Sequence, residues 1–80
     1  LIDGQIPFYD FLAFFDQEEL YNEFNYNTLS GLILEELEHI PQTGEKLSWR
    51  NFNFEIVDMD AARIDKVLVS MKPAANGEPA

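Results

Sequence analysis

The chain has 80 residues, of which 15 are acidic, five are Lys or Arg and one is His, so its formal net charge is −10 and its pI is about 4.1. Because 46% of the residues are hydrophobic and 14% are aromatic, the chain can build a core, and its length predicts one small acidic, soluble domain. The lack of cysteine excludes disulfides and thiolate metal sites, the single histidine excludes a His-rich zinc site, and the negative charge argues against a nucleic-acid partner.

The first stretch, Leu1-Ile2-Asp3-Gly4, is typical of a strand end followed by a turn. Because the sequence thus opens inside an element, we expect it to be a fragment of a longer polypeptide. A first helix is predicted to start at Pro7, since a proline has no N–H to leave unpaired at the first helical position.

The helix after Pro7 is predicted to pack one aromatic face on a core. At about 100° per residue, one arc contains four apolar side chains: Phe8, Phe11, Leu12 and Phe15. Tyr9 and Phe14 lie outside this arc on opposite sides, which makes them candidates for an interface with a partner. The acidic run that starts at Asp16 ends the pattern, and residues 20–26 are expected to form a loop with some apolar anchors.

A second helix is predicted from the capping side chains of Asn27 and Thr28 to about Glu38. Five apolar residues line one face of it: Leu29, Leu32, Ile33, Leu37 and Ile40. Glu36 falls within this apolar stripe. We therefore expect Glu36 either to pair with Arg50, Arg63 or a backbone donor, or to lie at a subunit contact, because a buried unpaired carboxylate is costly.

Beyond Gly44 the hydrophobic period changes from 3.6 to 2, which predicts strands. Apolar residues alternate with polar ones from 47 to 56, a β-branched run follows at 64–69, and turns are expected at 50–51 and 60–62. The fold class is therefore α+β, with two helices packed on one face of a mainly antiparallel three- to four-stranded sheet, Leu1-Ile2 supplying the fourth strand. We expect residues 1–72 to form the domain and residues 73–80, rich in Pro, Gly and Ala, to be a disordered tail.

Catalytic chemistry is not indicated. The glycines form no phosphate-binding loop, and no sequence around a serine resembles a nucleophile elbow. His39 stands at a helix end, where a cation complements the dipole, so we expect a structural role for it and no catalytic residue in the chain.

Asp58 and Asp60 are the metal-ligand candidates, because residues two apart in a strand face the same way and could meet one hard cation. An EF-hand starting at Asp58 is excluded, since Arg63 and Val69 stand where it needs glycine and glutamate. We expect at most weak Mg²⁺ or Ca²⁺ binding there, and the alternative is a solvated acidic face. Trp49, in a short strand that can form a sheet edge, either contacts a partner or caps the core.

Five stretches, in order and with short gaps, resemble the CorC/HlyC or transporter-associated domain: residues 1–4, 28–34, 40–45, 54–57 and 63–67. The resemblance implies the C-terminal part of a bacterial membrane protein, after a transmembrane region and a CBS-domain pair, among proteins named as magnesium and cobalt efflux factors or as hemolysins. One departure is Glu38, where the family usually has a glycine that ends the helix, so we expect the second helix to run longer here.

The function expected from this resemblance is that of a regulatory or interaction domain on the cytoplasmic side of the inner membrane, without catalysis. Its expected partners are the CBS pair and transmembrane region of the same parent chain. A homodimer through a strand edge or the Tyr9/Phe14 surface stays open. The alternative function is an FAD- or adenine-nucleotide-binding domain, which rests on fold analogy alone, and no cofactor is expected to bind tightly. No apolar stretch approaches the roughly 20 residues that span a bilayer, so this chain is not expected to insert into the membrane.

Overall fold

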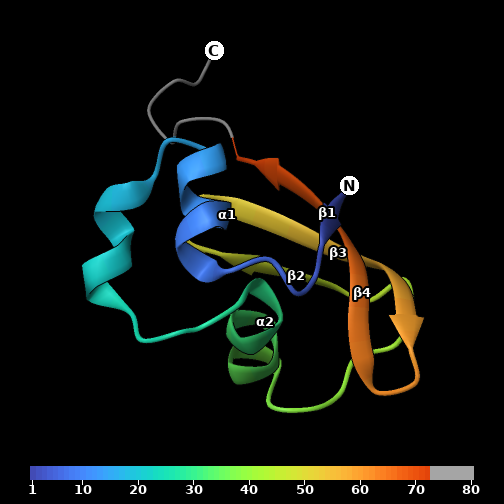
Figure 1. Cartoon of the computed structure of the whole chain (residues 1–80). Coiled ribbons are helices and arrows are strands. Elements are labelled where there is room, and N and C mark those ends of the chain that lie inside the picture. The colour runs from blue at the N-terminus through green and yellow to red at the C-terminus, as the bar shows by residue number, and fades with distance from the viewer. Residues whose placement is uncertain (73–80) are drawn as a thin grey trace.

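A computed structural model describes residues 1–72, and the tail predicted at 73–80 lies outside the described residues. The elements in chain order are β1 (Ile2–Asp3), α1 (Phe8–Phe14), the 3₁₀ helix η1 (Glu18–Glu23), α2 (Leu29–Leu37), β2 (Lys46–Trp49), β3 (Phe52–Asp60) and β4 (Arg63–Met71). The four strands form one sheet in the order β1-β4-β3-β2, and all neighbouring pairs are antiparallel. Figure 1 shows the helices on one side of this sheet, so the predicted α+β architecture is confirmed.

The core lies between the helices and the sheet. Its fully buried members are Phe8, Phe11 and Leu12 of α1, Leu29, Leu32 and Ile33 of α2, and Phe52, Phe54, Ile56, Ile64 and Val67 of the strands. The period of 3.6 in the helices and of 2 in β3 places their buried side chains on the same interface. Ile64 and Val67 of β4 are three residues apart, and both are buried because the pairing with β3 shifts register between them. The predicted apolar face of the first helix is therefore confirmed, with Phe15 packed against the core from its edge.

The first helix begins one residue later than predicted. Pro7 has ψ 142°, which is extended backbone, and so it precedes the helix instead of forming its first turn. A short antiparallel bridge joins Pro7 to Thr28, and the Phe8 N–H donates to the Asn27 carbonyl at 2.9 Å. These contacts hold the start of α1 against the start of α2.

The segment predicted as a loop at residues 20–26 contains most of η1 instead. Its apolar anchors are real, because Leu20, Phe24 and Tyr26 all pack against the core. The prediction of irregular structure was wrong because a 3₁₀ helix repeats every three residues and is stabilised here by tertiary packing, which an amphipathic period does not reveal.

The second helix is capped as predicted, but it ends earlier. The Thr28 Oγ1 accepts from the Gly31 N–H at 3.1 Å, which satisfies one of the unpaired donors of the first turn. At the other end Glu38 adopts the left-handed conformation, with φ 63° and ψ 24°, so the helix stops at Leu37 and does not run longer. Consequently Ile40 leaves the apolar face and is 59% exposed, contrary to expectation.

Both predicted hairpin turns are confirmed. Trp49 pairs with Phe52 across the first, and Asp60 pairs with Arg63 across the second. The pairing of β3 with β4 shifts register twice between Ile56 and Met59, which marks a bulged region in the longest strand pair.

Gly4 joins β1 to both layers. A Cβ at this position would lie 2.4 Å from the Ile64 carbonyl oxygen, closer than any side chain can approach. The Gly4 N–H donates to the Asp65 carbonyl, and its own carbonyl accepts from the Ser30 N–H, both at 2.8 Å. The close backbone approach that only glycine permits therefore binds β1 to β4 and to the first turn of α2 at once.

Candidate functional site

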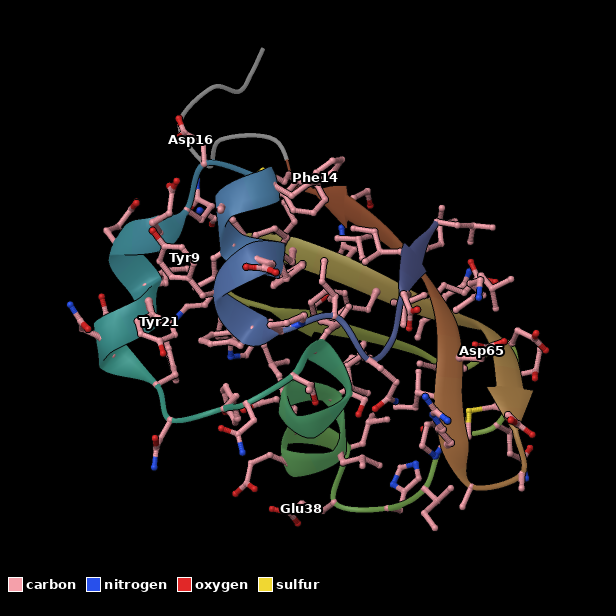
Figure 2. All side chains as sticks on the ribbon, in the orientation of Figure 1. Tyr9, Phe14, Asp16, Tyr21, Glu38 and Asp65 are labelled. Carbon is pink, nitrogen blue, oxygen red and sulfur yellow. The ribbon has the colours of Figure 1, made fainter. Side chains whose placement is uncertain are left out.

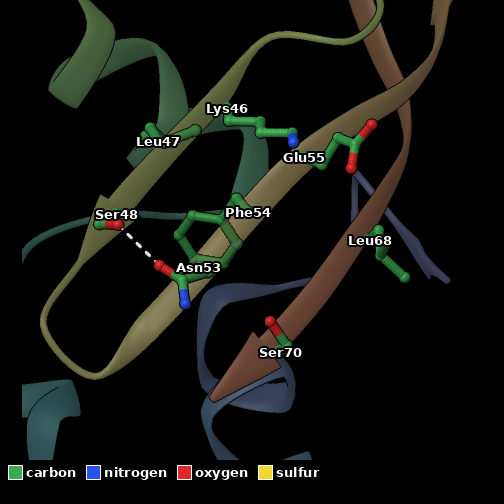
Figure 3. Close-up of a pocket in the computed structure, with 8 residues that line it drawn as sticks. All are labelled: Lys46, Leu47, Ser48, Asn53, Phe54, Glu55, Leu68 and Ser70. Carbon is green, nitrogen blue, oxygen red and sulfur yellow. Dashed lines mark hydrogen bonds between the residues drawn. The ribbon is translucent and has the colours of Figure 1, made fainter. Parts of the chain in front are cut away.

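The face of the sheet opposite the helices carries an open groove of about 410 Å³. Figure 3 shows its lining, which comes from three strands: Lys46, Leu47 and Ser48 of β2, Asn53, Phe54 and Glu55 of β3, and Leu68 and Ser70 of β4. Lys46 stands directly across from Glu55, and the Ser48 hydroxyl donates to the Asn53 Oδ1 at 2.7 Å. With one cation, one anion and largely paired polar groups, this groove offers a few hydrogen bonds but no cluster of donors for a phosphate.

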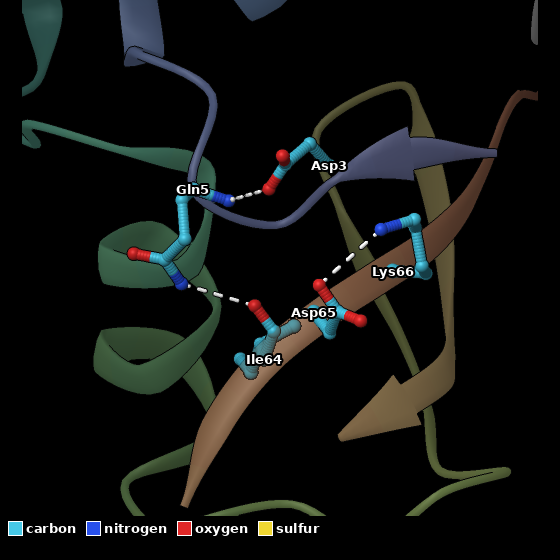
Figure 4. Close-up of polar contacts among 5 residues, drawn as sticks. All are labelled: Asp3, Gln5, Ile64, Asp65 and Lys66. Atoms are coloured by element: carbon cyan, nitrogen blue, oxygen red, sulfur yellow. Dashed lines mark hydrogen bonds and ion pairs between the residues drawn. The ribbon is translucent and has the colours of Figure 1, made fainter. Parts of the chain in front are cut away.

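A second polar region surrounds the turn after β1 (Figure 4). The Asp3 Oδ1 accepts from the Gln5 N–H at 2.8 Å, and the Gln5 side-chain amide donates to the Ile64 carbonyl at 3.0 Å. Beside them, the Lys66 Nζ lies 3.2 Å from the Asp65 Oδ1. These bonds fix the turn against β4, so we assign them a structural role.

The metal-ligand candidates Asp58 and Asp60 both lie in β3, each opposite a basic residue in the strand register. Asp58 is paired with Lys66 in the register, and Asp60 with Arg63. Among residues 1–72, no three His, Asp or Glu side chains come together in a group that could hold a metal ion. The weak cation site stays a prediction. The Lys66 Nζ is bound to Asp65, so this lysine is not paired with Asp58.

Trp49 belongs to the core, at 6% exposure. Its ring contacts Phe24, Phe8 and Phe52, with centroid distances of 5.0, 6.1 and 6.0 Å. The expectation of a partner contact was wrong, because β2 is an edge strand but its last side chain points to the helical side of the sheet. Of the two alternatives, the one in which Trp49 caps the core is confirmed.

Tyr9 and Phe14, the other aromatic interface candidates, are 48% and 73% exposed. The structure also adds an aromatic side chain that the sequence pattern missed. Tyr21 of η1 is 43% exposed, and its ring packs edge-to-face on Tyr9 with the centroids 5.1 Å apart. No amphipathic period marks residues 18–23, so nothing in the local sequence pattern pointed to Tyr21.

Glu36 is exposed, although it lies within the sequence stripe of apolar residues. It accepts a hydrogen bond from the Tyr26 hydroxyl at 3.3 Å. The pKa of Tyr26 is raised, first by burial of the hydroxyl and second by the negative charge of Glu36. The predicted partner Arg50 instead binds Glu23 at 3.0 Å and lies over the Phe24 ring. The expected pairing with an arginine was therefore wrong. Leu29 and Leu32 on the same stripe are buried, whereas Glu36 lies in the last turn of α2 and is exposed. The alternative, a subunit contact, stays a prediction.

The single histidine lies in the loop after α2. The His39 Nε2 is 2.5 Å from the Glu45 Oε2, and the Gln42 N–H donates to the other carboxylate oxygen at 3.1 Å. Two hydrogen bonds hold the pKa of Glu45 below its ordinary value: the larger effect comes from the Gln42 N–H and the smaller from His39. His39 thus closes the loop between α2 and β2. Its hydrogen-bond partner is the Glu45 carboxylate, which fits the structural role expected for it.

The charge of the molecule is unevenly divided between its two layers. Residues 1–45, which include every helix, hold ten Asp or Glu and no Lys or Arg, whereas residues 46–80 hold five of each. The whole net charge of −10 therefore falls on the part of the chain that contains the helical layer. The sequence alone shows this asymmetry, because all five Lys and Arg residues follow residue 45.

No helix within residues 1–72 has the length and apolar character needed to cross a bilayer.

Comparison with known proteins identifies relatives along the whole domain. The family model CorC_HlyC, described as "Transporter associated domain", matches residues 1–73. The chain is 45% identical over 75 residues to a UPF0053 protein of Synechocystis sp., covering 91% of this chain and 17% of that protein. It is 36% identical over 70 residues to the polyamine export protein of Escherichia coli K12, covering 88% of this chain and 16% of that protein. The chain thus spans less than a fifth of the length of these relatives.

Solved structures agree with the same relationship. A transporter-associated CorC_HlyC domain of a Xylella fastidiosa hemolysin, in complex with Mg⁺⁺ and Mn⁺⁺, is 35% identical with a TM-score of 0.75, over 90% of this chain and 85% of that one. The transporter-associated domain of a CBS domain protein from Porphyromonas gingivalis is 27% identical with a TM-score of 0.74, over 90% and 86% of the two chains.

Proposed function

Because the chain belongs to the CorC_HlyC family of transporter-associated domains, we propose that it is a regulatory domain of a longer cation-transport protein and has no reaction of its own. The observation that carries the proposal is the match over residues 1–73 to a domain that makes up only 16–18% of its polyamine-exporting relatives. A domain that makes up less than a fifth of a transport protein is suited to modulate transport that the rest of that protein performs.

The proposed cargo is a cation, and two chemical classes have support. The relatives named polyamine export proteins are 32–36% identical, which supports an organic polycation. The Xylella fastidiosa domain in complex with Mg⁺⁺ and Mn⁺⁺ supports a divalent metal, the class expected from the resemblance to magnesium and cobalt efflux proteins. The negative field of the helical layer attracts both classes.

The proposed setting is the cytoplasmic side of the inner membrane, beside a CBS-domain pair and a transmembrane region of the same protein. The related domain from a CBS domain protein of Porphyromonas gingivalis supports the CBS pair as a neighbour. A homodimer through a strand edge or the Tyr9/Phe14 surface stays a prediction, and β1 and β2 are the outer strands of the described sheet.

The alternative, a domain that binds FAD or an adenine nucleotide, has less support from the groove. The groove lining provides Lys46 as its one positive side chain, directly across from Glu55. A dinucleotide brings a pyrophosphate that needs several donors, and the net charge of −10 lowers the affinity for any anion. The chemistry of this surface therefore favours the regulatory function.

Isothermal titration of the purified chain separates these two functions. We expect no heat of binding with FAD or AMP, and at most millimolar binding of MgCl₂ or CaCl₂. The matched control is Lys46→Gln, which removes the groove's positive side chain and leaves the helical layer unchanged. Binding of FAD or AMP at micromolar concentration, lost in Lys46→Gln, would contradict the proposal and place a nucleotide in the groove.

A further inference from the structure

Two exposed tyrosine rings are held against each other on the outside of the helical layer. Tyr9 of α1 and Tyr21 of η1 are 48% and 43% exposed, and their rings meet at 89°. Tyr21 also stacks on the buried Phe8 with a centroid distance of 6.1 Å, so the pair is anchored on the core. Figure 2 shows both rings in the space between α1 and η1. Rings that are already fixed lose little conformational freedom when a partner covers them.

Carboxylates without a positive partner follow Tyr9 and precede Tyr21 along α1, η1 and the connection between them. Asp10 follows Tyr9, and Glu18 and Glu19 form the first turn of η1. Asp16 lies in the connection between the helices (Figure 2). Within residues 1–72, none of these four carboxylates forms an ion pair, while Glu23 at the far end of η1 is bound to Arg50.

Charge decides which occupant fits this surface. A second copy of the chain would bring a helical layer of the same sign, so self-association here is opposed by repulsion between like charges. A partner that combines apolar side chains with Lys or Arg would cover the rings and neutralise the carboxylates together. Lysine and arginine also bind favourably over tyrosine faces, which adds a second attraction at the same place.

From these observations we propose that Tyr9, Tyr21 and the neighbouring Asp10, Glu18 and Glu19 form a docking surface for a basic amphipathic helix. We call it the α1–η1 surface. It lies in the helical layer, whereas the groove of about 410 Å³ is on the other face of the sheet. The apolar rings supply contact area, and the carboxylates set the orientation and speed of encounter. The inference goes beyond regulation of transport and does not depend on the cargo.

The test is an NMR titration of the isotope-labelled 80-residue chain with a synthetic three-heptad peptide of leucine and lysine. We expect the shift changes to concentrate on residues 9–23. A peptide with glutamate in place of lysine serves as the matched control and is expected to cause none. Raised salt should weaken binding, because part of the attraction is between charges.

Variants then separate the α1–η1 surface from general acidity. Tyr9→Ala should weaken binding of the lysine peptide about fivefold, which is typical of a moderate interface contact. Glu19→Lys should weaken it further and reduce the dependence on salt. The controls Leu68→Ser and Glu55→Gln, on the opposite face of the sheet, should leave affinity within about twofold. Far-UV circular dichroism confirms that each variant is folded, and Glu19→Lys keeps the test decisive if Tyr9→Ala fails to fold.

Three results would overturn the inference. The first is no binding of the lysine peptide, and the second is shift changes spread equally over Glu35 and Asp58, which would mean non-specific attraction. The third is spermidine causing the same localised changes at equal affinity, which would make the surface a small-cation site instead of a protein-docking surface.

Discussion

Replacing Glu38 by glycine should stabilise the domain, because Glu38 holds a backbone conformation that disfavours side chains. It ends α2 with φ 63° and ψ 24°, and its N–H donates to the Leu34 carbonyl at 2.8 Å. That bond is an ordinary bond of the last helical turn, and the left-handed conformation of Glu38 then turns the following chain away from the helix. The side chain itself is exposed (Figure 2), so its removal sacrifices no packing.

The expected gain can be assembled from three contributions. A side chain in the left-handed region costs about 1–2 kcal/mol, and the greater freedom of glycine in the unfolded chain returns about 0.5–1 kcal/mol of that. The Glu38 carboxylate also stands at the negative end of the helix, where its removal contributes roughly 0.3 kcal/mol at an exposed position. The free energy of unfolding should therefore rise by about 1 kcal/mol, or roughly 4–8 °C in Tm for a domain of this size.

Urea unfolding followed by the fluorescence of Trp49, the single tryptophan, measures this change. Glu38→Gln is the matched control, since it removes the charge but keeps the left-handed side chain. In low salt the free energy of unfolding should be highest for the glycine variant, lower for the glutamine variant and lowest for the unaltered chain. In high salt only the glycine variant should remain more stable than the unaltered chain. A glycine variant no more stable than the glutamine variant in high salt would refute the assignment of backbone strain to Glu38.

Three further changes test separate contacts. Gly4→Ala should lower the free energy of unfolding by about 1–3 kcal/mol in a thermal melt, because its Cβ would meet the Ile64 carbonyl at 2.4 Å, and unchanged stability would contradict the close approach. Thr28→Ala should lose about 1 kcal/mol by removing the helix cap while Thr28→Ser retains most of it, and equal losses in both would show that the Oγ1 bond is unimportant. Glu45, whose pKa is lowered in the folded state, contributes stability above the ordinary glutamate pKa that is lost as pH falls through the lowered value. Glu45→Gln should therefore flatten the urea midpoint over that acidic range, and an unchanged pH profile would rule out its contribution.

Much of the fold follows from periodicity and turn chemistry in the sequence. Phe8, Phe11 and Leu12 recur at helical spacing and are buried together, and Thr28 caps the second helix as its hydroxyl predicts. The two-residue turn at Arg50 follows from strands that alternate on either side of it. These features are local, so the chemistry of a few neighbouring residues determines them.

The failures have tertiary causes. The position of Trp49 in a strand does not tell whether a partner or the core supplies its neighbours, and one of these neighbours is Phe24, which directly follows η1. Glu36 lies within the apolar stripe on a helical wheel, but a wheel does not show how far along the helix the core extends, and Glu36 in the last turn of α2 is exposed. Glu38 ends α2 in the left-handed conformation usual for glycine, and the helix propensity of glutamate alone does not predict that.

The candidate surfaces divide in the same way. The exposure of Tyr9 and Phe14 followed from the helical wheel, whereas the contact of Tyr9 with Tyr21 depends on how η1 folds back on α1. The sequence also predicts both α-helices within residues 1–45, where the negative charge is concentrated, and the fold adds η1, which carries Tyr21, to the same acidic layer.

Transport by the longer protein, with and without this domain, tests the proposed regulation most directly. Inverted membrane vesicles that contain equal amounts of either form would be given labelled spermidine, Mg²⁺ or Co²⁺ in turn. We predict that the form without the domain still transports one of these cations, but at a different rate or with a different dependence on cation concentration. Identical transport curves for the two forms, or complete loss of transport at equal abundance, would contradict a regulatory role.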